Sequence, residues 1–380
     1  MHSFYFNTSS EIQFANGALK QASFERLGAR VLFVTDNGLR KLGITESVEK
    51  ALGTRLVIFD AVEADPSLET LMAAVDFGRS ELVTGVLGLG GGSSMDVAKL
   101  VALLLGSGQD LEAAWGVGNA TGPRLPLILV PTTSGTGSEV TPVAIITVGA
   151  EEKRGVSSPL ILPDVAILDP ELTVGLPPNI TAATGVDAMV HAIEAYTSRN
   201  ANNNPMSRML AVQALDLLGA NIETAVARGG NLEARGAMLM GSMLAGMAFA
   251  NSPVAAVHAL AYPIGGIFHV PHGLSNALIL AQVMRFNAPE CAAEYATLAP
   301  HVFPDIDTKQ GVQAVCAEFI ERLSNLSVRL GLPSRLRDVG IPEEACKKMA
   351  KDAMVQQRLL VNNPREVREE DALNVYRSAW

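Results

Sequence analysis

Short apolar runs alternate with helical patterns through the first 170 residues of the chain. The runs are rich in β-branched residues and end in polar or glycine-rich turns, as is typical of strands buried on both faces of a parallel sheet. They are Val31–Thr35, Leu56–Phe59, Leu82–Leu89 and Leu127–Val130. Helical patterns lie between them, such as Leu68–Arg79 and Met95–Leu105. This alternation predicts an α/β layer in which ligands bind at the carboxyl ends of the strands.

The pattern changes at residues 169–178 (DPELTVGLPP), where three prolines and a glycine fall within ten residues. The hydrophobic spacing downstream is helical. It predicts helices at Ala182–Ser198, Met206–Leu218, Leu232–Phe249, Ser275–Phe286, Val312–Leu330, Glu343–Ala353 and Glu370–Ser378. We therefore expect an α/β domain at residues 1–178 and an all-α domain at residues 179–380, with a ligand site in the cleft between them.

One long segment, residues 236–284, contains no Asp, Glu, Lys or Arg. Its length is sufficient to cross a bilayer, which is the alternative to a buried core. However, it contains three histidines, and it is interrupted by Asn251-Ser252-Pro253, by Pro263, by Gly265-Gly266 and by Pro271. Histidines are unfavourable in lipid. We therefore predict a buried helical core rather than a membrane span.

The overall composition is that of a globular chain, with 380 residues, 48% hydrophobic and 18% charged. The net charge of −10 argues against nucleic-acid binding and against a polybasic membrane surface. The three cysteines, Cys291, Cys316 and Cys346, are an odd number without C-x-x-C spacing, which disfavours a disulfide scaffold and a thiolate zinc site. The N-terminal residues show no signal-peptide pattern, so we expect a cytoplasmic protein.

A glycine-rich turn follows one predicted strand, in Leu82–Lys99 (LVTGVLGLGGGSSMDVAK). Glycines let backbone N–H groups approach an anion, and the start of a helix favours negative charge, so a pyrophosphate suits this turn. Neither G-x-G-x-x-G nor the G-x-x-x-x-G-K-[ST] phosphate loop matches it, and a turn without a ligand is the alternative. A second polar turn, Pro131–Glu139, follows the next strand; its hydroxyls suit ribose, phosphate or a carboxamide.

An acidic residue, Asp36, follows the first predicted strand. In that place it could accept hydrogen bonds from an adenosine ribose and so favour NAD over NADP. Because Asp36 precedes the glycine turn in the chain, the order is the reverse of the usual one. An N-cap or a turn residue is the alternative interpretation of Asp36.

Four of the six histidines lie between residues 191 and 272. Asp187 and His191 are four residues apart, which places them on one face of a helix. With His258 and His272 they form a set of three imidazoles and one carboxylate that suits Fe²⁺ or Zn²⁺. The alternatives are that His191 is an ordinary polar helix residue and that His269 and His272 are loop residues.

Several stretches together resemble the iron-dependent (group III) alcohol dehydrogenase family over essentially the whole chain. They are GGGSSMDVAK at 90–99, PTTSGTGSEVT at 131–141, residues 169–178, TGVDAMVHAIEA at 184–195, HALAYPIGGIFHVPHG at 258–273 and ALNVYRSAW at 372–380. The resemblance implies a Rossmann-like dinucleotide-binding domain, an all-α C-terminal domain as in dehydroquinate synthase-like folds, and NAD(P)-linked alcohol and aldehyde interconversion.

By position, the resemblance implies the metal ligands Asp187, His191, His258 and His272. It implies a dinucleotide site formed by Asp36, Gly91, Gly92, Ser93, Asp96, Thr132, Thr133, Thr141, Lys153, Leu172 and Gly175. One position departs from the family, because many members carry a proton-relaying histidine where this chain has Tyr262. A tyrosine is a weaker relay at neutral pH, so either Tyr262 or the nearby His269 is the candidate.

The expected function is hydride transfer between NAD and a small primary alcohol or its aldehyde, with an Fe²⁺ or Zn²⁺ ion as Lewis acid. A zinc-dependent polyol or hydroxyacid dehydrogenase, or a hydroxyacid–oxoacid transhydrogenase, is the alternative on the same fold. A non-catalytic metal- or nucleotide-binding relative is the alternative from another class. The family resemblance also implies a homodimer or a higher homo-oligomer.

Overall fold

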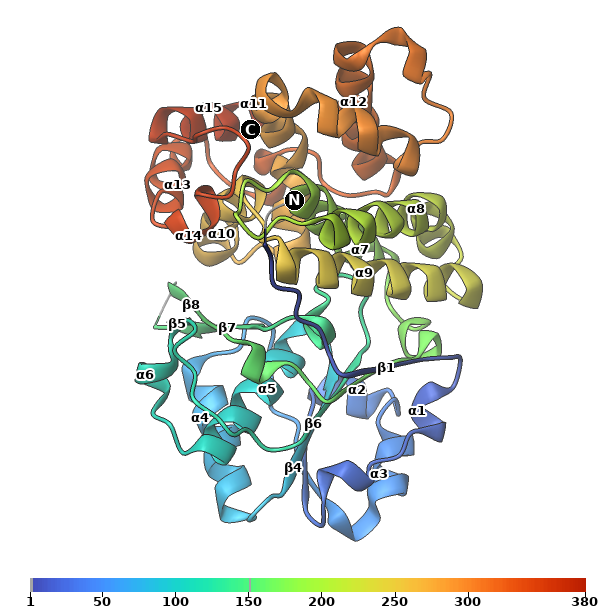
Figure 1. The fold of residues 1–380 in the computed structure, drawn as a ribbon, viewed down its shortest axis with the longest axis vertical. Coiled ribbons are helices and arrows are strands. Elements are labelled where there is room, and N and C mark those ends of the chain that lie inside the picture. Colours follow the sequence, from blue (N-terminus) through green and yellow to red (C-terminus); the bar gives the residue numbers. More distant parts are fainter. Residues whose placement is uncertain (1–2, 150–151) are drawn as a thin grey trace. The chain divides into compact units, whose positions relative to one another are not determined.

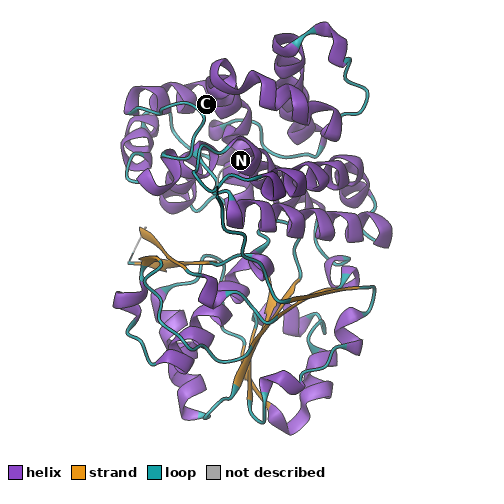
Figure 2. Ribbon diagram, viewed as in Figure 1, coloured by secondary structure: helices purple, strands orange, loops and turns teal. Residues whose placement is uncertain are grey.

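A computed structural model describes residues 3–149 and 152–380. The chain forms two compact units (Figures 1 and 2). The α/β unit consists of Asn7–Gly175, and the helical unit consists of Leu176–Trp380 together with residues 3–6. The boundary between the units falls between Gly175 and Leu176, whereas the sequence predicted a domain boundary at residue 178. Residues 3–6 differ from the prediction, which placed them in the first domain. There, Tyr5 N donates a hydrogen bond to Asn202 Oδ1 over 2.8 Å.

The α/β unit is built on a parallel six-stranded sheet in the order β1-β9-β6-β4-β2-β3. Its strands are β1 (Glu11–Phe14), β2 (Val31–Val34), β3 (Leu56–Phe59), β4 (Gly85–Gly90), β6 (Leu127–Pro131) and β9 (Val165–Leu168). The helices of this unit are α1 (Ala18–Gln21), α2 (Asn37–Lys41), α3 (Glu46–Leu52), α4 (Leu68–Ser80), α5 (Gly92–Ser107) and α6 (Leu111–Ala114). The predicted parallel α/β fold is confirmed.

Both faces of the sheet are buried, which explains the continuous apolar runs of the sequence. Along β2, Leu32 and Val34 face a core shared with α4 and α5. Val31 and Phe33 alternate with them and face a second core shared with α1 and α3. Because β2, β4 and β6 are buried on both faces, the position of these strands is well specified by the sequence alone.

Some strands were not predicted. The edge strand β1 has the sequence EIQF, and none of its residues is buried. The small sheet β5-β8-β7 contains β5 (Gly116–Val117) and the antiparallel pair β7 (Val143–Val148) and β8 (Glu152–Ser157). The strand β8 has the sequence EKRGVS, whose charges hide the strand pattern.

The helical unit contains nine α-helices within its described residues. They are α7 (Pro178–Thr197), α8 (Pro205–Ala227), α9 (Leu232–Asn251), α10 (Ala256–Phe268), α11 (His272–Val302), α12 (Val312–Arg329), α13 (Ala345–Ala353), α14 (Gln357–Leu360) and α15 (Glu369–Ala379). Their apolar faces enclose one large core. This agrees with the predicted all-α C-terminal region.

Two helices extend well beyond their predicted ends. The helix α8 continues past Gly219, where a Cβ atom would come within 2.8 Å of the Val302 backbone. This glycine permits close packing of α8 against the end of α11 rather than ending the helix. The helix α11 continues to Val302 across a kink at Cys291.

The uncharged segment also differs in detail from the prediction. The predicted breaks at Asn251-Ser252-Pro253 and at Pro271 are present, since α9 ends at Asn251 and α11 begins at His272. The helix α10, however, runs through Pro263 and Gly265-Gly266, where breaks were also predicted. Among the described residues, α8 is long and apolar enough to span a membrane, and α9 with α10 passes the same test as a pair bent by 107°. These helices pack within the helical unit, and most of the residues of α10 are buried there.

Candidate metal centre and cofactor loops

The four predicted metal ligands converge in the helical unit. One ligand atom from each of Asp187, His191, His258 and His272 lies within 4.8 Å of the others. His258 Nε2 lies 4.0 Å and His272 Nε2 lies 3.8 Å from Asp187 Oδ1. Asp187, His191 and His258 are buried, whereas the His272 side chain is 40% exposed. One side of the cluster is therefore accessible to a small molecule.

Three helices place these side chains. Asp187 and His191 lie one turn apart on α7, His258 lies in the first turn of α10, and His272 is the first residue of α11. Gly273 allows α11 to begin against α7, because a Cβ atom there would come within 2.6 Å of Ala183 O. The His191 ring stacks between neighbours, with its centroid 4.7 Å from that of His258 and 4.4 Å from that of Phe249.

The charge on Asp187 is stabilised by its neighbours. Burial acts to raise the pKa of this carboxyl group. The three histidines and an amide hydrogen bond from Asn276 outweigh burial, and they hold the pKa of Asp187 below its usual value. The cluster therefore presents a carboxylate together with three imidazoles, which is a donor set suited to a borderline divalent cation.

Asn276 provides an independent observation that the cluster fits a cation. Its Nδ2 donates to Asp187 Oδ1 over 2.6 Å and lies 3.3 Å from both His258 Nε2 and His272 Nε2. Its Oδ1 is buried without a hydrogen-bond partner among the described residues. The Asn276 amide hydrogens thus face Asp187 Oδ1, His258 Nε2 and His272 Nε2, the three atoms that a bound cation would also satisfy. With a cation present, rotation of the amide group would turn Oδ1 toward the positive charge.

Sequence reasoning did not identify Asn276 or the buried Glu194, which contacts His258. Their spacing gave a signal. Asn276 is four residues after His272 on α11, and Glu194 is three residues after His191 on α7. Both therefore share a helix face with a ligand candidate.

The glycine-rich turn of the α/β unit joins β4 to α5. Gly90 has φ +153°, and a Cβ atom there would lie 2.6 Å from Ser94 Oγ, so the turn requires glycine at this position. Gly91 is the N-cap residue of α5, and no side chain caps this helix or places an acid in its first turn. The predicted residues Gly92 and Ser93 begin the helix, so this N-terminus suits a phosphate.

The second polar turn lies directly beside the first, because β4 and β6 are neighbours in the sheet. Thr132 N donates to Gly90 O over 2.9 Å. A Cβ atom at Gly91 would lie 3.7 Å from Thr133 Cγ2, and one at Gly92 would lie 2.9 Å from Thr136 Cγ2. The structure thus brings the two turns together, as expected for the carboxyl ends of adjacent parallel strands.

A buried lysine holds the second turn in place. Lys99 Nζ donates to Ser138 Oγ over 2.7 Å, to Thr141 Oγ1 over 3.2 Å and to Val143 O over 2.7 Å. Asp96 accepts from Ser138 Oγ over 2.6 Å and lies 3.6 Å from Lys99 Nζ. Two predicted cofactor residues, Asp96 and Thr141, thus belong to a buried polar network beneath the turns.

The electrostatics of this network are set by burial. Burial lowers the pKa of Lys99, although the nearby Asp96 and Glu139 partly offset this effect. Burial raises the pKa of Asp96 and raises that of Glu139 to about 7. Glu139 Oε1 has no hydrogen-bond partner among the described residues, so the positive charge of Lys99 is important for stabilising the ionised form of Glu139.

Asp36 is the N-cap residue of α2, and its Oδ1 accepts from Leu39 N over 2.9 Å. It follows β2, which pairs with β4 in parallel. Asp36 therefore lies at the same edge of the sheet as the glycine-rich turn. The N-cap interpretation of Asp36 is confirmed, and it is compatible with a second role toward a ribose.

The remaining predicted cofactor residues have structural partners of their own. Lys153 Nζ lies 2.8 Å from Asp65 Oδ1 and donates to Thr147 Oγ1 over 2.8 Å. Leu172 packs on the core shared with α1 and α3. Gly175 has no atom within 4 Å of a Cβ placed on it, which agrees with an open position at the end of the unit.

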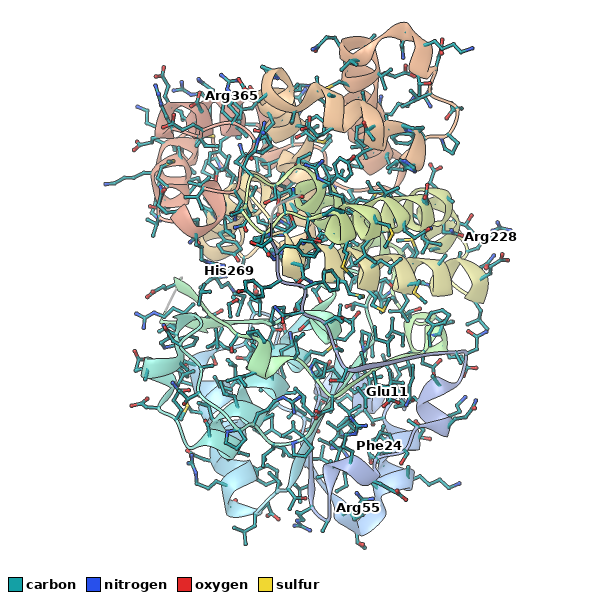
Figure 3. The ribbon with its side chains drawn as sticks, in the orientation of Figure 1. Glu11, Phe24, Arg55, Arg228, His269 and Arg365 are labelled. Carbon is teal, nitrogen blue, oxygen red and sulfur yellow. The ribbon has the colours of Figure 1, made fainter. Side chains whose placement is uncertain are left out.

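The two relay candidates have different surroundings. The Tyr262 ring lies 6.3 Å from that of His272, and its hydroxyl accepts from Arg358 Nη2 over 3.1 Å. His269 is an exposed residue with φ +54° that ends α10 (Figure 3). Of the two relay candidates, Tyr262 is therefore the one whose ring is known to lie near a candidate metal ligand, His272.

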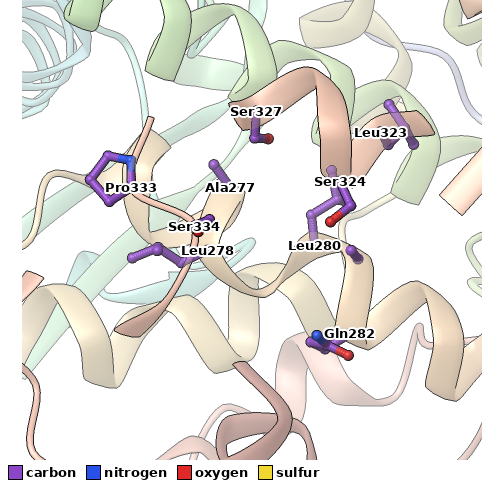
Figure 4. A pocket seen from close by; sticks show the side chains of 10 residues that line it. Ala277, Leu278, Leu280, Gln282, Leu323, Ser324, Ser327, Pro333 and Ser334 are labelled. Atoms are coloured by element: carbon purple, nitrogen blue, oxygen red, sulfur yellow. The ribbon is translucent and has the colours of Figure 1, made fainter. Parts of the chain in front are cut away.

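A surface pocket lies between α11, α12 and the segment that follows α12 (Figure 4). None of the predicted site residues lines it. The pocket is therefore separate from the histidine cluster and from the glycine-rich turn.

Comparison with known proteins identifies the family. Residues 9–170 match the family described as iron-containing alcohol dehydrogenase. Residues 181–380 match the C-terminal part of the Fe-containing alcohol dehydrogenase family. The chain belongs to the iron-containing alcohol dehydrogenase family.

Members of this family resemble the chain over nearly its full length. Long-chain-alcohol dehydrogenase 1 of Geobacillus thermodenitrificans is 42% identical, with 96% of this chain and 93% of the relative covered. A solved 1,3-propanediol oxidoreductase covers 100% of both chains with a TM-score of 0.95 and 33% identity. Sulfoacetaldehyde reductase from Bifidobacterium kashiwanohense, solved in complex with NAD⁺, has a TM-score of 0.87 and 29% identity, covering 100% of this chain and 99% of that one.

As a member of this family, the protein is an oxidoreductase that interconverts alcohols and aldehydes with NAD. Iron and NAD are the cofactors that the family and its structures indicate. The cluster of Asp187 with three histidines agrees with the iron assignment.

Proposed function

We propose that Asp187, His191, His258 and His272 hold one divalent ion, Fe²⁺ or Zn²⁺, and that the physiological substrate is a small primary alcohol or its aldehyde. The observation that carries this proposal is the convergence of the four ligand atoms within 4.8 Å. When bound, the ion supplies Lewis acidity to the alcohol or carbonyl oxygen, while NAD accepts or donates the hydride.

The chain's own residues bind, orient and exclude water. One side of the site is shielded from water by the buried Asp187, His191 and His258. The substrate can approach from the other side, where the His272 side chain is exposed. Residues near His258 are largely apolar, which favours a small apolar substrate. The turns at Gly91–Ser93 and Thr132–Thr133 would hold the dinucleotide phosphates, with Asp36 toward the ribose.

A second candidate substrate is a short aldehyde that carries an anionic group. Arg358 Nη2 donates to the Tyr262 hydroxyl over 3.1 Å, and the Tyr262 ring lies 6.3 Å from that of His272, so one side chain separates this cation from the cluster. A relative of similar structure is named sulfoacetaldehyde reductase. Arginine binds carboxylate and sulfonate groups through paired N–H donors.

The function is tested by NADH oxidation with metal-stripped protein that is refilled anaerobically with Fe²⁺ or Zn²⁺. The panel contains propionaldehyde, a long-chain aldehyde, glyceraldehyde and sulfoacetaldehyde. We expect turnover only after refilling, with the highest kcat/KM for propionaldehyde. A preference for sulfoacetaldehyde that is lost in Arg358→Gln would favour the second candidate. Turnover by metal-free protein would contradict the proposed metal role.

Asp36 is expected to select NAD against NADP. In Asp36→Ser the charge is removed while a good N-cap is kept, so α2 remains capped. Loss of repulsion toward the 2′-phosphate should raise the NADPH/NADH ratio of kcat/KM about tenfold or more. Steady-state kinetics with both cofactors measure this ratio. Negligible NADPH use by both Asp36→Ser and Asp36→Gly would show that Asp36 does not face the ribose.

Tyr262 is the favoured proton relay, because its ring lies beside His272. Tyr262→Phe removes only the hydroxyl and should lower kcat about 100-fold at neutral pH, the usual scale of one general acid–base group. Tyr262→His should retain or increase kcat. His269→Ala is the comparison: a larger loss in this variant than in Tyr262→Phe would assign the relay to His269.

We also propose that the protein is a cytoplasmic homodimer. The three cysteines are free and buried, which agrees with a reducing compartment. The dimer is supported by the family resemblance of the sequence. Light scattering coupled to gel filtration measures the oligomeric state, and a monomeric mass would contradict the dimer.

A further inference from the structure

Glu194 is a buried acid outside the predicted site, and it lies on the same helix as two ligand candidates. It follows His191 by three residues on α7, and it is 4% exposed. A carboxylate that is buried to this extent needs several hydrogen-bond donors. The hydrogen-bond donors to Glu194 therefore indicate the role of this side chain.

Three donors to Glu194 come from the beginning of α10. Oε1 accepts from Val257 N over 2.7 Å, and Oε2 accepts from Ala255 N over 3.1 Å. The third contact joins Oε2 to His258 Nδ1 over 2.6 Å. Glu194 therefore binds the backbone of the first turn of α10 and the imidazole that this turn carries.

The contact with Glu194 fixes the state of the His258 ring. A carboxylate oxygen only accepts hydrogen bonds, so Nδ1 must carry the hydrogen. In the neutral imidazole the lone pair is then on Nε2. This is the atom that lies 4.0 Å from Asp187 Oδ1 and 3.3 Å from Asn276 Nδ2 within the ligand cluster.

We propose that Glu194 is a positioning residue of the metal centre, which fixes the tautomer and ring orientation of His258 and anchors the first turn of α10. This inference rests on the proposed metal-binding function and adds a residue to it. Outer residues that bind a ligand imidazole in this way typically change metal affinity 10- to 100-fold when they are removed.

Helix capping alone does not account for an acid at this position. The N-terminus of α10 has no cap from its own N-cap residue, Ala255. Elsewhere in the unit, Asn204 and Asn231 cap α8 and α9 through one side-chain oxygen each, without a charge. Glu194 instead directs one oxygen to both a backbone donor and the His258 ring.

The experiment measures metal affinity and the His258 ring separately from turnover. Apparent Kd values for Zn²⁺ are obtained by chelator competition for the wild type, Glu194→Ala, Glu194→Gln and Asn231→Ala. The last variant is the matched control, because it removes a helix cap of the same unit without contact to a ligand. Melting temperatures of the metal-free proteins report the purely structural effect of each change.

We expect a Kd about 100-fold weaker in Glu194→Ala and about tenfold weaker in Glu194→Gln, whose single amide oxygen can still accept from His258. Asn231→Ala should bind like the wild type. In ¹H–¹⁵N spectra of the zinc-loaded wild type, His258 should show a protonated Nδ1 and a metal-bound Nε2. In Glu194→Ala the Nδ1 proton should exchange rapidly with water.

Two results distinguish the possible failures. A Zn²⁺ affinity equal to that of the wild type in Glu194→Gln would overturn the positioning role of the carboxylate, whether or not Glu194→Ala folds. Wild-type protein that binds Zn²⁺ no more tightly than Asp187→Ala would instead overturn the proposed metal site, on which this inference rests.

Discussion

The Asp187→Ala variant is expected to lose both its metal and its turnover. The change removes the one anionic ligand from the cluster and leaves Asn276 Nδ2 without its shortest acceptor. Lewis-acid stabilisation amounts to several kcal/mol, so kcat/KM for an aldehyde should fall about 1000-fold or more. Metal content after gel filtration and NADH oxidation measure the two losses.

Asp216→Ala is the matched control for this variant. Asp216 also pairs with a histidine of the helical unit, since its Oδ1 lies 2.9 Å from His301 Nδ1. That pair is partly exposed and lies outside the ligand cluster. Metal content and kcat/KM should therefore remain within about twofold of the wild type. Full metal content and full turnover in Asp187→Ala would contradict the assigned ligand set.

The Lys99→Met variant should be strongly destabilised. Lys99 is fully buried, and its ammonium group compensates the partly buried Asp96 and the buried Glu139. Removal of one partner from a buried ion pair typically costs about 3–5 kcal/mol, which corresponds to a fall in melting temperature on the order of 10 °C. Because Lys99 also holds Ser138 and Thr141, the KM for NADH should rise in the protein that remains folded.

Lys20→Met is the control for Lys99→Met, because Lys20 makes an exposed ion pair with Glu171. Such pairs contribute about 0–1 kcal/mol, so the melting temperature should change little. Equal melting temperatures for wild type and Lys99→Met would contradict the role of the buried network.

The destabilisation of Lys99→Met should also depend on pH. Glu139 has a pKa of about 7 in the folded protein, above its unfolded value, and loss of the cation raises it further. The folded state then binds more protons than the unfolded state, so stability falls as pH rises from about 4.5 through the folded pKa. The difference in melting temperature between wild type and Lys99→Met should therefore be larger at pH 8 than at pH 5.

The interior strands β2, β4 and β6 and the two polar turns could be predicted because burial constrains their residues strongly, although the equally buried interior strand β9 was missed. In β2, every position is buried, and in the turn after β4 Gly90 adopts a conformation that favours glycine. The edge strand β1 and the hairpin strand β8 carry charged residues, so their pairing depends on neighbours that are distant in sequence. Tertiary packing also overrides local signals, since α10 continues through Pro263.

The candidate metal-ligand cluster could be predicted because His191, His258 and His272 are chemically distinctive. Asn276 and Glu194 were not, because an amide and an acid are common on helices and only their contacts reveal their roles. The family resemblance added residues around the turns, but the structure shows that Asp96 and Thr141 contact the Lys99 network. Such buried networks depend on three-dimensional packing and have no periodic pattern in the sequence.

The most direct test of the central claim is anomalous diffraction at the iron edge from crystals loaded anaerobically with Fe²⁺. We predict one strong peak per chain, bound by Asp187, His191, His258 and His272. A peak at other residues, or no peak in protein that turns over, would contradict the assignment of this cluster as the catalytic metal centre.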